Sequence, residues 1–292
     1  MSLPVYLTKQ VFLRRIFVSQ ASKGEVARPM DMQLATRRAF VSGSTQGIGY
    51  SIARALLQEG TAVVINGRTE SRVEGAVEAL RSEVPGAHVS GIAADFDQPS
   101  EVQRLLGTLD DVDILVNNVG LFELKPFGEI SDDDWTRYFD VNVMSGVRLS
   151  RALLPKMIDA GWGRVIFVSS ESGVNIPADM THYGVTKAGM LALGNGLAKL
   201  TRGTGVTVNT ILGGPTYSDG VAQTIEQIAA EQQLAPENLK AMIIGGNQTS
   251  LLERFLDPEE IAHLAVFLAS PLSSATNGAA LRADGGVLTA ML

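Results

Sequence analysis

The sequence contains no cysteine and only three histidines, and these shortages exclude several kinds of site. Without cysteine the chain can form no disulfide scaffold, no thiolate metal site and no cysteine nucleophile. The histidines, His88, His182 and His263, are too scattered to suggest a histidine-rich metal centre. Hydrophobic runs are short as well, because none approaches the roughly 20 residues needed to cross a bilayer. We therefore expect a soluble, cytoplasmic protein with no metal and no membrane partner.

Positive charge is also scarce over most of the chain. Across 292 residues, 31 acidic side chains outnumber 24 basic ones, and the net charge is −7. Residues 1–29 depart from this trend, since Glu25 is their one acid among several lysines and arginines. Nucleic-acid phosphates are neutralised by clustered Lys and Arg, which the acidic remainder does not offer. We expect no nucleic-acid partner.

The basic segment at residues 1–29 and the rest of the chain are expected to be distinct. The segment contains arginine and little acid, as a transit peptide does. Met30 and Met32 stand just before the first strand-like run, so the segment can equally be a dispensable extension or reflect a translation start placed too early. We predict an extension of uncertain role at 1–29 and a single domain at 30–292, which shows no internal linker or repeat.

Short runs rich in β-branched residues recur along the domain and predict the strands of a parallel sheet. Several are apolar on consecutive residues, as expected for strands that are covered on both faces. Each run is separated from the next by a stretch long enough for a crossover helix. The runs lie at 38–41, 62–66, 88–93, 114–117, 164–169, 206–212 and 279–283. The predicted fold is α/β: a Rossmann-type doubly wound sheet of seven mainly parallel strands with helices on both faces.

Three glycines, Gly43, Gly47 and Gly49, separate the first predicted strand from a helix expected at 50–59. Glycine at such a turn lets the backbone turn tightly and approach a pyrophosphate, while the helix N-terminus offers free N–H groups to the anion. The spacing differs from the Gly-x-Gly-x-x-Gly of the common dinucleotide fingerprint. On spacing alone, a phosphate-binding turn and an ordinary strand-to-helix turn are both open.

A second pattern combines Tyr183 with Lys187 at the start of a helical stretch. Residues four apart share one face of a helix, so the ammonium can stand beside the phenol. A nearby positive charge favours the phenolate and brings a tyrosine pKa closer to neutrality. Ser170 follows the fifth predicted strand, at the edge of the sheet where ligands bind in open α/β folds. By itself, the Tyr–Lys spacing also fits a surface pair.

Taken in order, these motifs resemble the short-chain dehydrogenase/reductase family over residues 32–286, with members such as the 3-oxoacyl-carrier-protein reductases. Residues 42–49 are similar to the family's Thr-Gly-x-x-x-Gly-x-Gly cofactor turn, with Ser42 in place of threonine. Residues 117–120 are similar to its Asn-Asn-Ala-Gly motif, which supports the central sheet. One departure is Gly213, where the family usually has proline, and a more flexible loop is expected there.

The resemblance implies a catalytic tetrad and a cofactor site at matching positions. The tetrad would be Asn142, Ser170, Tyr183 and Lys187. Tyr183 and Lys187 would also contact the cofactor, and Asp95 would contact its adenine and Thr216 its carboxamide. The remaining cofactor residues would be Gly43, Ser44, Gln46, Gly47, Ile48, Gly49, Arg68, Asn117, Gly120 and Gly214.

The activity that the resemblance implies is hydride transfer between a nicotinamide and a carbonyl or alcohol carbon. Tyr183 would protonate the carbonyl oxygen, and Ser170 would hydrogen-bond it. Lys187 would lower the Tyr183 pKa and contact the nicotinamide ribose, while Asn142 would hold a water in the relay from Lys187 to solvent. A catalytically silent dinucleotide-binding scaffold or sensor is the alternative, and the complete tetrad favours the enzyme.

The end of the second predicted strand indicates which nicotinamide is preferred. NAD-specific sheets commonly place an acid there, which would repel a 2′-phosphate. This chain has Asn66 and then Arg68, a fixed charge with a forked donor that suits phosphate. Gln46 is neutral at the family's other phosphate-binding position. We expect NADP(H) to be preferred, with NAD(H) possible.

The substrate and the assembly are less closely defined. Residues 217–255 fall where the family has its mobile substrate lid, and a small ketone, a sugar, a steroid and a carrier-bound 3-oxoacyl group all remain open as substrates. A homotetramer or homodimer is expected, paired through the helices after the fourth and fifth strands. Pocket candidates, for which solvated loop positions fit equally well, are Glu171, Asn175, Met180 and His182.

Overall fold

The computed structural model describes residues 30–246 and 249–291. The predicted extension at 1–29 lies outside the described residues. Contacts along the chain group Met32–Leu292 into one compact unit, separate from Met1–Asp31. The following description concerns the larger unit.

The described residues of this unit form a seven-stranded sheet in the order β3-β2-β1-β4-β5-β6-β7. Every neighbouring pair of strands is parallel, which confirms the predicted Rossmann-type sheet. The strands are β1 Arg38–Val41, β2 Ala62–Gly67, β3 Val89–Ala93, β4 Ile114–Asn117, β5 Trp162–Ser170, β6 Gly205–Gly213 and β7 Ala280–Ala283.

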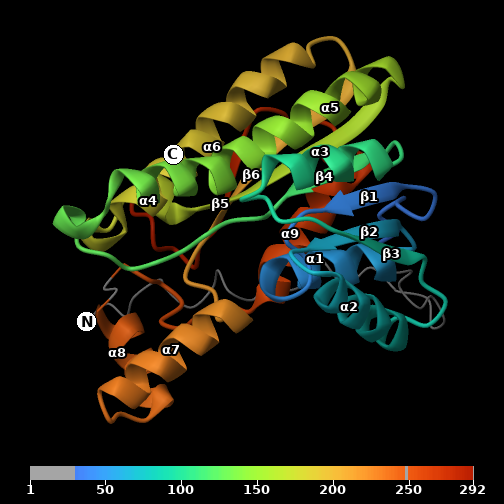
Figure 1. Cartoon of the computed structure of the whole chain (residues 1–292). Helices are drawn as coiled ribbons and strands as arrows, with labels where there is room; N and C mark the ends of the chain where they lie inside the picture. Colours follow the sequence, from blue (N-terminus) through green and yellow to red (C-terminus); the bar gives the residue numbers. More distant parts are fainter. Residues whose placement is uncertain (1–29, 247–248, 292) are drawn as a thin grey trace, which may run out of the picture. The chain divides into compact units, whose positions relative to one another are not determined.

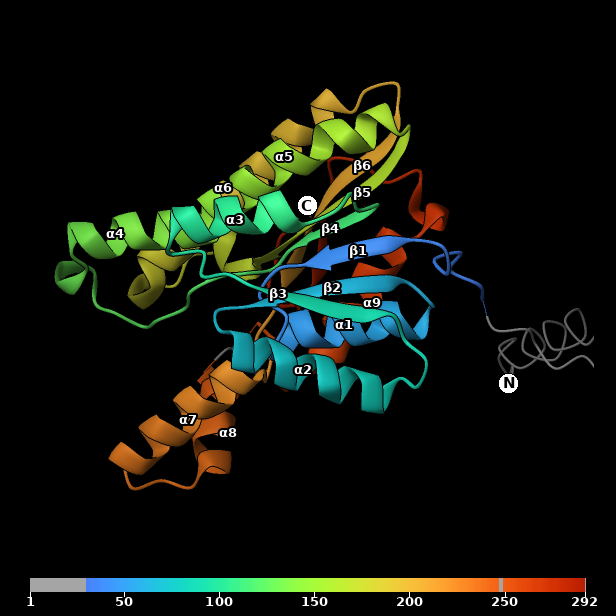
Figure 2. The ribbon, with the colours of Figure 1, turned by 45° about the vertical axis from the view of Figure 1, so that its right-hand side comes forward.

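Two layers of helices cover the sheet, because successive strand residues point to opposite faces. In β1, Ala39 and Val41 join the core under α1, α2 and α9, whereas Phe40 joins the core under α3, α5 and α6. Figures 1 and 2 show the two layers on either side of the strands. The helices are α1 Gly47–Gln58, α2 Glu70–Glu83 and α9 Pro258–Ala269 on one face, and α3 Pro99–Thr108, α5 Ser145–Asp159 and α6 Thr181–Leu200 on the other.

Two elements are longer in the structure than the sequence predicts. The first helix begins at Gly47, three residues before the predicted start, because the glycine turn itself enters the helix. The fifth strand runs from Trp162 to Ser170, longer at both ends than predicted. Parallel pairing with β6 continues to the last residue, where Ser170 is opposite Gly213, so Ser170 lies at the carboxyl end of the strand.

Three elements lie outside the two layers. The helix α4 (Asp132–Phe139) continues through a π-helical turn, Asp140–Met144, into α5. The helices α7 (Asp219–Glu231) and α8 (Pro236–Gly246) fall in the region expected to form the lid, and they pack on each other through a small core that contains Ile225, Ala229 and Leu239. Figure 1 shows this helix pair projecting beyond the carboxyl ends of the strands.

The order of the strands reverses between β1 and β4. The chain leaves β1 toward β2 on one side and β4 toward β5 on the other, so the connections after β1 and β4 diverge and leave a crevice at their carboxyl ends. Ligands of open α/β sheets bind in such a crevice. Among the described residues, no helix combines the length and the hydropathy required to span a membrane.

A chain that begins at Met30 is expected to fold, because the unit Met32–Leu292 contains the whole sheet and both helical layers. We expect its melting temperature to lie within about 2 °C of that of the full chain, since termini commonly contribute little to domain stability. Differential scanning calorimetry of both proteins measures this. A loss of many degrees would mean that residues 1–29 contribute to the fold.

Candidate active site

The carboxyl ends of β1 and β4 are joined by one buried hydroxyl. Ser42 Oγ donates to the Val116 carbonyl at 3.2 Å and accepts from the backbone N–H groups of Asn118 and Val119 at 3.0 and 3.1 Å. The Asn118 amide donates in turn to the Gly43 carbonyl at 2.9 Å. These bonds fix both sides of the crevice, and they need only the hydroxyl that serine and threonine share. Asn118 was not predicted as a site residue, although it lies within the Asn-Asn-Val-Gly motif.

The glycine turn requires its glycines for two reasons. Gly43 and Gly47 have φ of +60° and +61°, a conformation that disfavours a side chain. A Cβ on Gly49 would lie 2.4 Å from both the Gly43 carbonyl oxygen and the Asn118 amide nitrogen. Gln46 precedes α1 and makes no side-chain cap, so the N–H groups at the start of α1 are left for an anionic group. The turn therefore fits the diphosphate of a dinucleotide.

The two remaining predicted residues of the turn differ in exposure. Ser44 is fully buried, donates to the Val41 carbonyl at 2.6 Å and accepts from the Asn66 N–H at 3.0 Å. Its side chain thus supports the turn, and its backbone N–H donates to the Asn66 carbonyl at 2.8 Å. Ile48 is half-buried and packs against the core under α1.

An acidic side chain of α7 lies at this anion site. Asp219 Oδ2 accepts from the Gly47 N–H at 2.6 Å. Ser218 is close as well, because a Cβ on Gly47 would lie 3.3 Å from the Ser218 Cβ. A phosphate bound to the same N–H would meet a like charge, so Asp219 and a dinucleotide compete for the start of α1.

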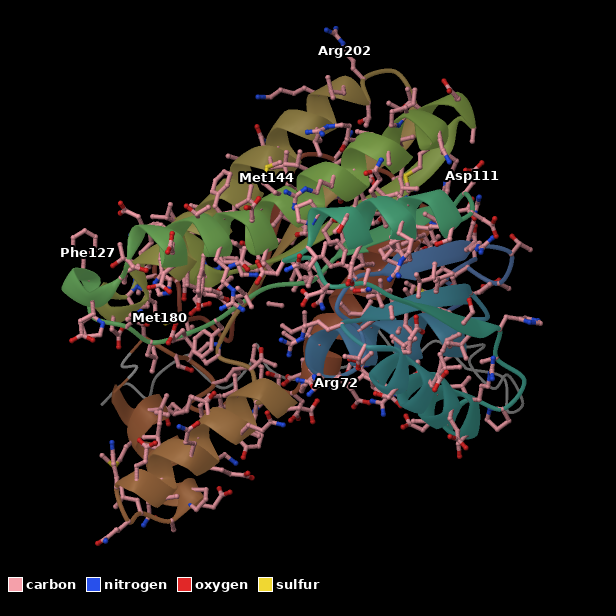
Figure 3. The ribbon with its side chains drawn as sticks, in the orientation of Figure 1. Arg72, Asp111, Phe127, Met144, Met180 and Arg202 are labelled. Atoms are coloured by element: carbon pink, nitrogen blue, oxygen red, sulfur yellow. The ribbon has the colours of Figure 1, made fainter. Side chains whose placement is uncertain are left out.

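The region at the end of β2 contains the buried amide of Asn66 and two exposed guanidinium groups, those of Arg68 and Arg72. Asn66 is 1% exposed, accepts from the Gly43 N–H at 3.1 Å and donates to the Ile92 carbonyl at 3.0 Å, so its side chain is engaged within the protein. Arg68 and Arg72 are exposed, and neither guanidinium has a hydrogen bond or ion pair with another described residue. Arg72, which sequence reasoning missed, lies in the first turn of α2 (Figure 3).

The other predicted cofactor residues also lie at this edge of the sheet. Asp95 follows β3 and accepts from the Asp97 N–H at 3.0 Å. Asn117 ends β4 but is only 2% exposed, and its amide donates to Ser150 on α5 at 3.4 Å, so this side chain supports the packing of α5 on the sheet. A Cβ on Gly120 would lie 3.5 Å from Lys187 Nζ, which places the loop after β4 beside the α6 residues.

The loop after β6 brings the last two predicted cofactor residues to the same edge. A Cβ on Gly214 would lie 2.6 Å from the Asp284 carbonyl oxygen, so this position admits no side chain. Thr216 is 7% exposed, and its hydroxyl donates to the Gly214 carbonyl at 2.9 Å.

The four predicted tetrad residues come from three elements. Ser170 ends β5, Tyr183 and Lys187 lie in the first two turns of α6, and Asn142 lies in the π-helical turn before α5. Ser169, beside Ser170, donates from its hydroxyl to the Lys187 carbonyl at 2.9 Å and so fixes α6 against the end of β5.

Asn142 is fully buried, and both polar atoms of its side chain have hydrogen-bond partners. Its Oδ1 accepts from the Leu121 N–H at 2.6 Å, and its amide donates to the Leu121 carbonyl at 3.2 Å and to Thr186 Oγ1 at 2.9 Å. Asn142 thus fastens the loop after β4 to α6. Because both amide hydrogens are engaged, a water held by Asn142 would bind its backbone or donate to the second lone pair of Oδ1.

Lys187 is buried beside Tyr183, and burial lowers the pKa of its ammonium to about 8. Its Nζ donates to the Val168 carbonyl at 3.0 Å and lies 5.5 Å from the centre of the Tyr183 ring. The pKa of Tyr183 is raised, first by burial and then by the negative charge of Glu171. This differs from the expected lowering by Lys187, because desolvation disfavours the phenolate more than that ammonium favours it.

The four pocket candidates differ in their burial and in their contacts. Glu171 is half-buried, and one of its carboxylate oxygens accepts from the Ser170 hydroxyl at 2.5 Å. His182 is fully buried against Tyr138, with ring centres 4.1 Å apart, and neither ring nitrogen has a hydrogen-bond partner in the described part of the chain. Burial lowers its pKa. Met180 is also buried, whereas Asn175 is exposed.

Residues 37–229 match the profile of a protein family described as short chain dehydrogenase. This match covers more than half of the chain. The chain belongs to the short chain dehydrogenase family. It is therefore an oxidoreductase of the class that interconverts CH–OH and C=O groups with a nicotinamide dinucleotide.

Relatives across nearly the whole chain agree with this assignment. This dehydrogenase is 44% identical to the uncharacterized oxidoreductase YvaG of Bacillus subtilis, over 89% of the chain and 98% of the relative. It is 30% identical to the 3-oxoacyl-[acyl-carrier-protein] reductase FabG of Aquifex aeolicus, over 88% of the chain and 100% of the relative. The structure of L-sorbose reductase from Gluconobacter frateurii, complexed with NADPH and L-sorbose, superposes with a TM-score of 0.84 at 29% identity, covering 90% of this chain and 100% of that one.

Removing the charge of Asp219 should tighten cofactor binding, because the Gly47 N–H then loses a competing anion. For an exposed hydrogen bond worth about 0.5 to 1.5 kcal/mol, Asp219→Asn should lower the Kd for NADPH by roughly twofold to tenfold. Fluorescence titration measures this. Glu226→Gln, which removes an exposed acid of the same helix, is the control and should change little. Unchanged or weaker binding in Asp219→Asn would show that the two do not compete.

Proposed function

We propose that this dehydrogenase transfers a hydride between NADP(H) and a carbonyl or alcohol substrate, with Asn142, Ser170, Tyr183 and Lys187 as its catalytic tetrad. One observation carries the proposal. A strand end, a helix start and a π-helical turn bring the four residues to the carboxyl edge of the sheet, where open α/β sheets bind ligands. When bound, the nicotinamide supplies or accepts the hydride.

Tyr183 would donate the proton to the carbonyl oxygen. Its raised pKa keeps the phenol protonated at neutral pH, as a general acid for carbonyl reduction must be. Among the residues that the structure describes, Lys187 carries the cation over this ring, and burial lowers its pKa to about 8, so it can exchange a proton near neutral pH. Asn142 positions α6 through Thr186, whose hydroxyl donates to the Tyr183 carbonyl at 2.7 Å.

Tyr183→Phe should remove the proton donor without disturbing the fold. Because general acid catalysis contributes about 100-fold to 10,000-fold, we expect kcat to fall by that factor. The Kd for NADPH should stay within about twofold. Turnover is followed by nicotinamide absorbance over a panel of ketones and alcohols with both NADPH and NADH, and cofactor binding by fluorescence. A variant that keeps most of its rate would contradict the role of Tyr183, whereas a wild type that binds NADPH but turns over no carbonyl would favour the scaffold.

The preference for NADP(H) is proposed from the free guanidinium groups at the end of β2. No acid stands between Asn66 and Thr69 to repel a 2′-phosphate, and Arg68 has no protein partner among the described residues. Arg72 adds a second exposed guanidinium four residues later. These two guanidinium groups lie where the adenosine of the cofactor is expected, and their positive charge favours NADP(H), which carries a 2′-phosphate, over NAD(H).

Arg68→Ala should weaken NADPH binding and leave NADH almost unaffected. A charge-assisted hydrogen bond contributes about 1.5 to 3 kcal/mol, so the Kd for NADPH should rise roughly tenfold to a hundredfold. Arg202→Ala, at the far end of α6 in Figure 3, removes an equally exposed arginine and serves as the control. Equal losses for both cofactors, or a wild type that prefers NADH, would show that Arg68 does not recognise the 2′-phosphate.

A homodimer or homotetramer is proposed from the outer face of α5 and α6. Between the helices lies an apolar groove of about 290 Å³, and Leu200 at its end is 65% exposed. Burying such a patch against a second copy would remove it from water, and a two-fold axis would pair the same helices. The groove is lined by Val147, Ser150, Arg151, Leu154, Pro155, Leu193, Leu197 and Leu200.

Leu200→Asp should therefore weaken the assembly, because a carboxylate would be buried at the interface. Light scattering after size exclusion should show a dimer or tetramer for the wild type and a shift toward monomer for this variant. Met242→Asp, a similar change at an exposed position of α8, should leave the assembly unchanged. A monomeric wild type, or an equal effect of both substitutions, would contradict this interface.

A further inference from the structure

An acidic residue directly follows Ser170 and contacts it. Glu171 Oε2 accepts from the Ser170 hydroxyl at 2.5 Å, and Glu171 Oε1 accepts from the Ser172 hydroxyl at 3.1 Å. The backbone N–H of Ser172 donates to Ser170 Oγ at 3.1 Å. The side chains of Ser170 and Ser172 are buried and Glu171 is half-buried, so the carboxylate belongs to the site and not to open solvent.

This contact determines where the Ser170 hydroxyl donates its hydrogen bond. A serine hydroxyl has one hydrogen to donate, and here that hydrogen is directed to Glu171. Ser170 therefore cannot donate to a substrate carbonyl oxygen while the contact persists. For Ser170 to turn to the substrate, Glu171 must receive another donor, because a half-buried carboxylate that loses a hydrogen bond without replacement is destabilised.

We propose that Glu171 makes this enzyme selective for substrates with a hydroxyl on the carbon next to the reacting carbonyl: α-hydroxy ketones and, in the reverse direction, vicinal diols. The substrate hydroxyl donates to Glu171 and releases the Ser170 hydroxyl for the carbonyl oxygen. Ser170 Oγ and Glu171 Oε2 are adjacent at 2.5 Å, so they suit two oxygens on neighbouring carbons. This inference rests on the proposed function of the same site.

Charge narrows the substrate class further. A substrate carboxylate directly beside the carbonyl would be repelled by Glu171, so 2-oxo acids are disfavoured. A substrate ammonium is disfavoured too, because the buried Lys187 already interacts electrostatically with this carboxylate. A neutral hydroxyl satisfies Glu171 without adding charge to the pocket.

Two ketones that differ in one group test the inference. In 1-hydroxy-2-butanone and 3-pentanone, a hydroxyl of the first takes the place of a methyl in the second. With NADPH, we expect kcat/KM for the hydroxy ketone to exceed that for 3-pentanone by about tenfold to a hundredfold, as for a hydrogen bond to a charged group. Equal kcat/KM values would overturn the inference and leave hydride transfer intact.

The residue is tested with Glu171→Leu, in which Ser170 is free and no carboxylate awaits a donor. Here the ratio of kcat/KM for the hydroxy ketone to kcat/KM for 3-pentanone should fall to about threefold or less, whatever the change in the absolute rates. Glu78→Leu, an exposed acid on α2, is the matched control and should keep the wild-type preference. A preference that persists in Glu171→Leu would overturn the role of Glu171.

Glu171→Gln provides a second variant of nearly the same shape, in case the leucine variant does not fold. It retains an acceptor but no charge, so it should lose at least about half of the wild-type preference on a logarithmic scale. A full wild-type preference in this variant would contradict the inference. If the wild type oxidises NADPH with neither ketone nor any other carbonyl of the panel, the proposed function itself fails, which is a different result from equal rates.

Discussion

The buried Ser42 hydroxyl joins the ends of β1 and β4, and the arrangement of the site depends on that junction. A doubly wound sheet opens where the order of its strands reverses, and connections that diverge there need an internal tie. With Ser42 and Asn118 in place, the glycine turn is held so closely that position 49 admits no side chain. The start of α1 is therefore fixed on one side of the crevice and the loop after β4 on the other.

Across the crevice, two buried or half-buried charges of opposite sign surround Tyr183. Burial and then the negative charge of Glu171 raise the pKa of Tyr183, and the Lys187 ammonium near its ring does not reverse the rise. The same carboxylate takes the hydrogen of Ser170, so the proton donor and the neighbouring hydroxyl both respond to Glu171. At the other end of the crevice, Asp219 occupies the Gly47 N–H. Acidic groups thus stand at both ends of a site that is expected to accept an anionic cofactor and, we propose, an uncharged substrate.

Local sequence patterns could predict the strands and the places of Ser170, Tyr183 and Lys187 in the fold, whereas Asn142 was proposed only from the resemblance to the family. Consecutive apolar residues indicate doubly covered strands, and Ser170 follows from the end of one of them. Patterns could not show that the Asn142 side chain forms hydrogen bonds with Leu121 and Thr186, because those partners are distant in sequence. The raised pKa of Tyr183 was missed for a similar reason, since burial is a property of packing. Arg72 could have been found from its spacing to Arg68, while Asp219 could not, because its contact with Gly47 crosses 172 positions.

The central claim is that a hydride passes between a nicotinamide and a carbonyl carbon at this site. Reduction of a ketone with NADPH that carries deuterium at the transferable position of the nicotinamide tests it most directly. The account predicts that the product alcohol, examined by NMR, carries one deuterium on its carbinol carbon and has a single configuration there. An alcohol without deuterium at that carbon, or NADPH oxidised with no alcohol formed, would contradict it.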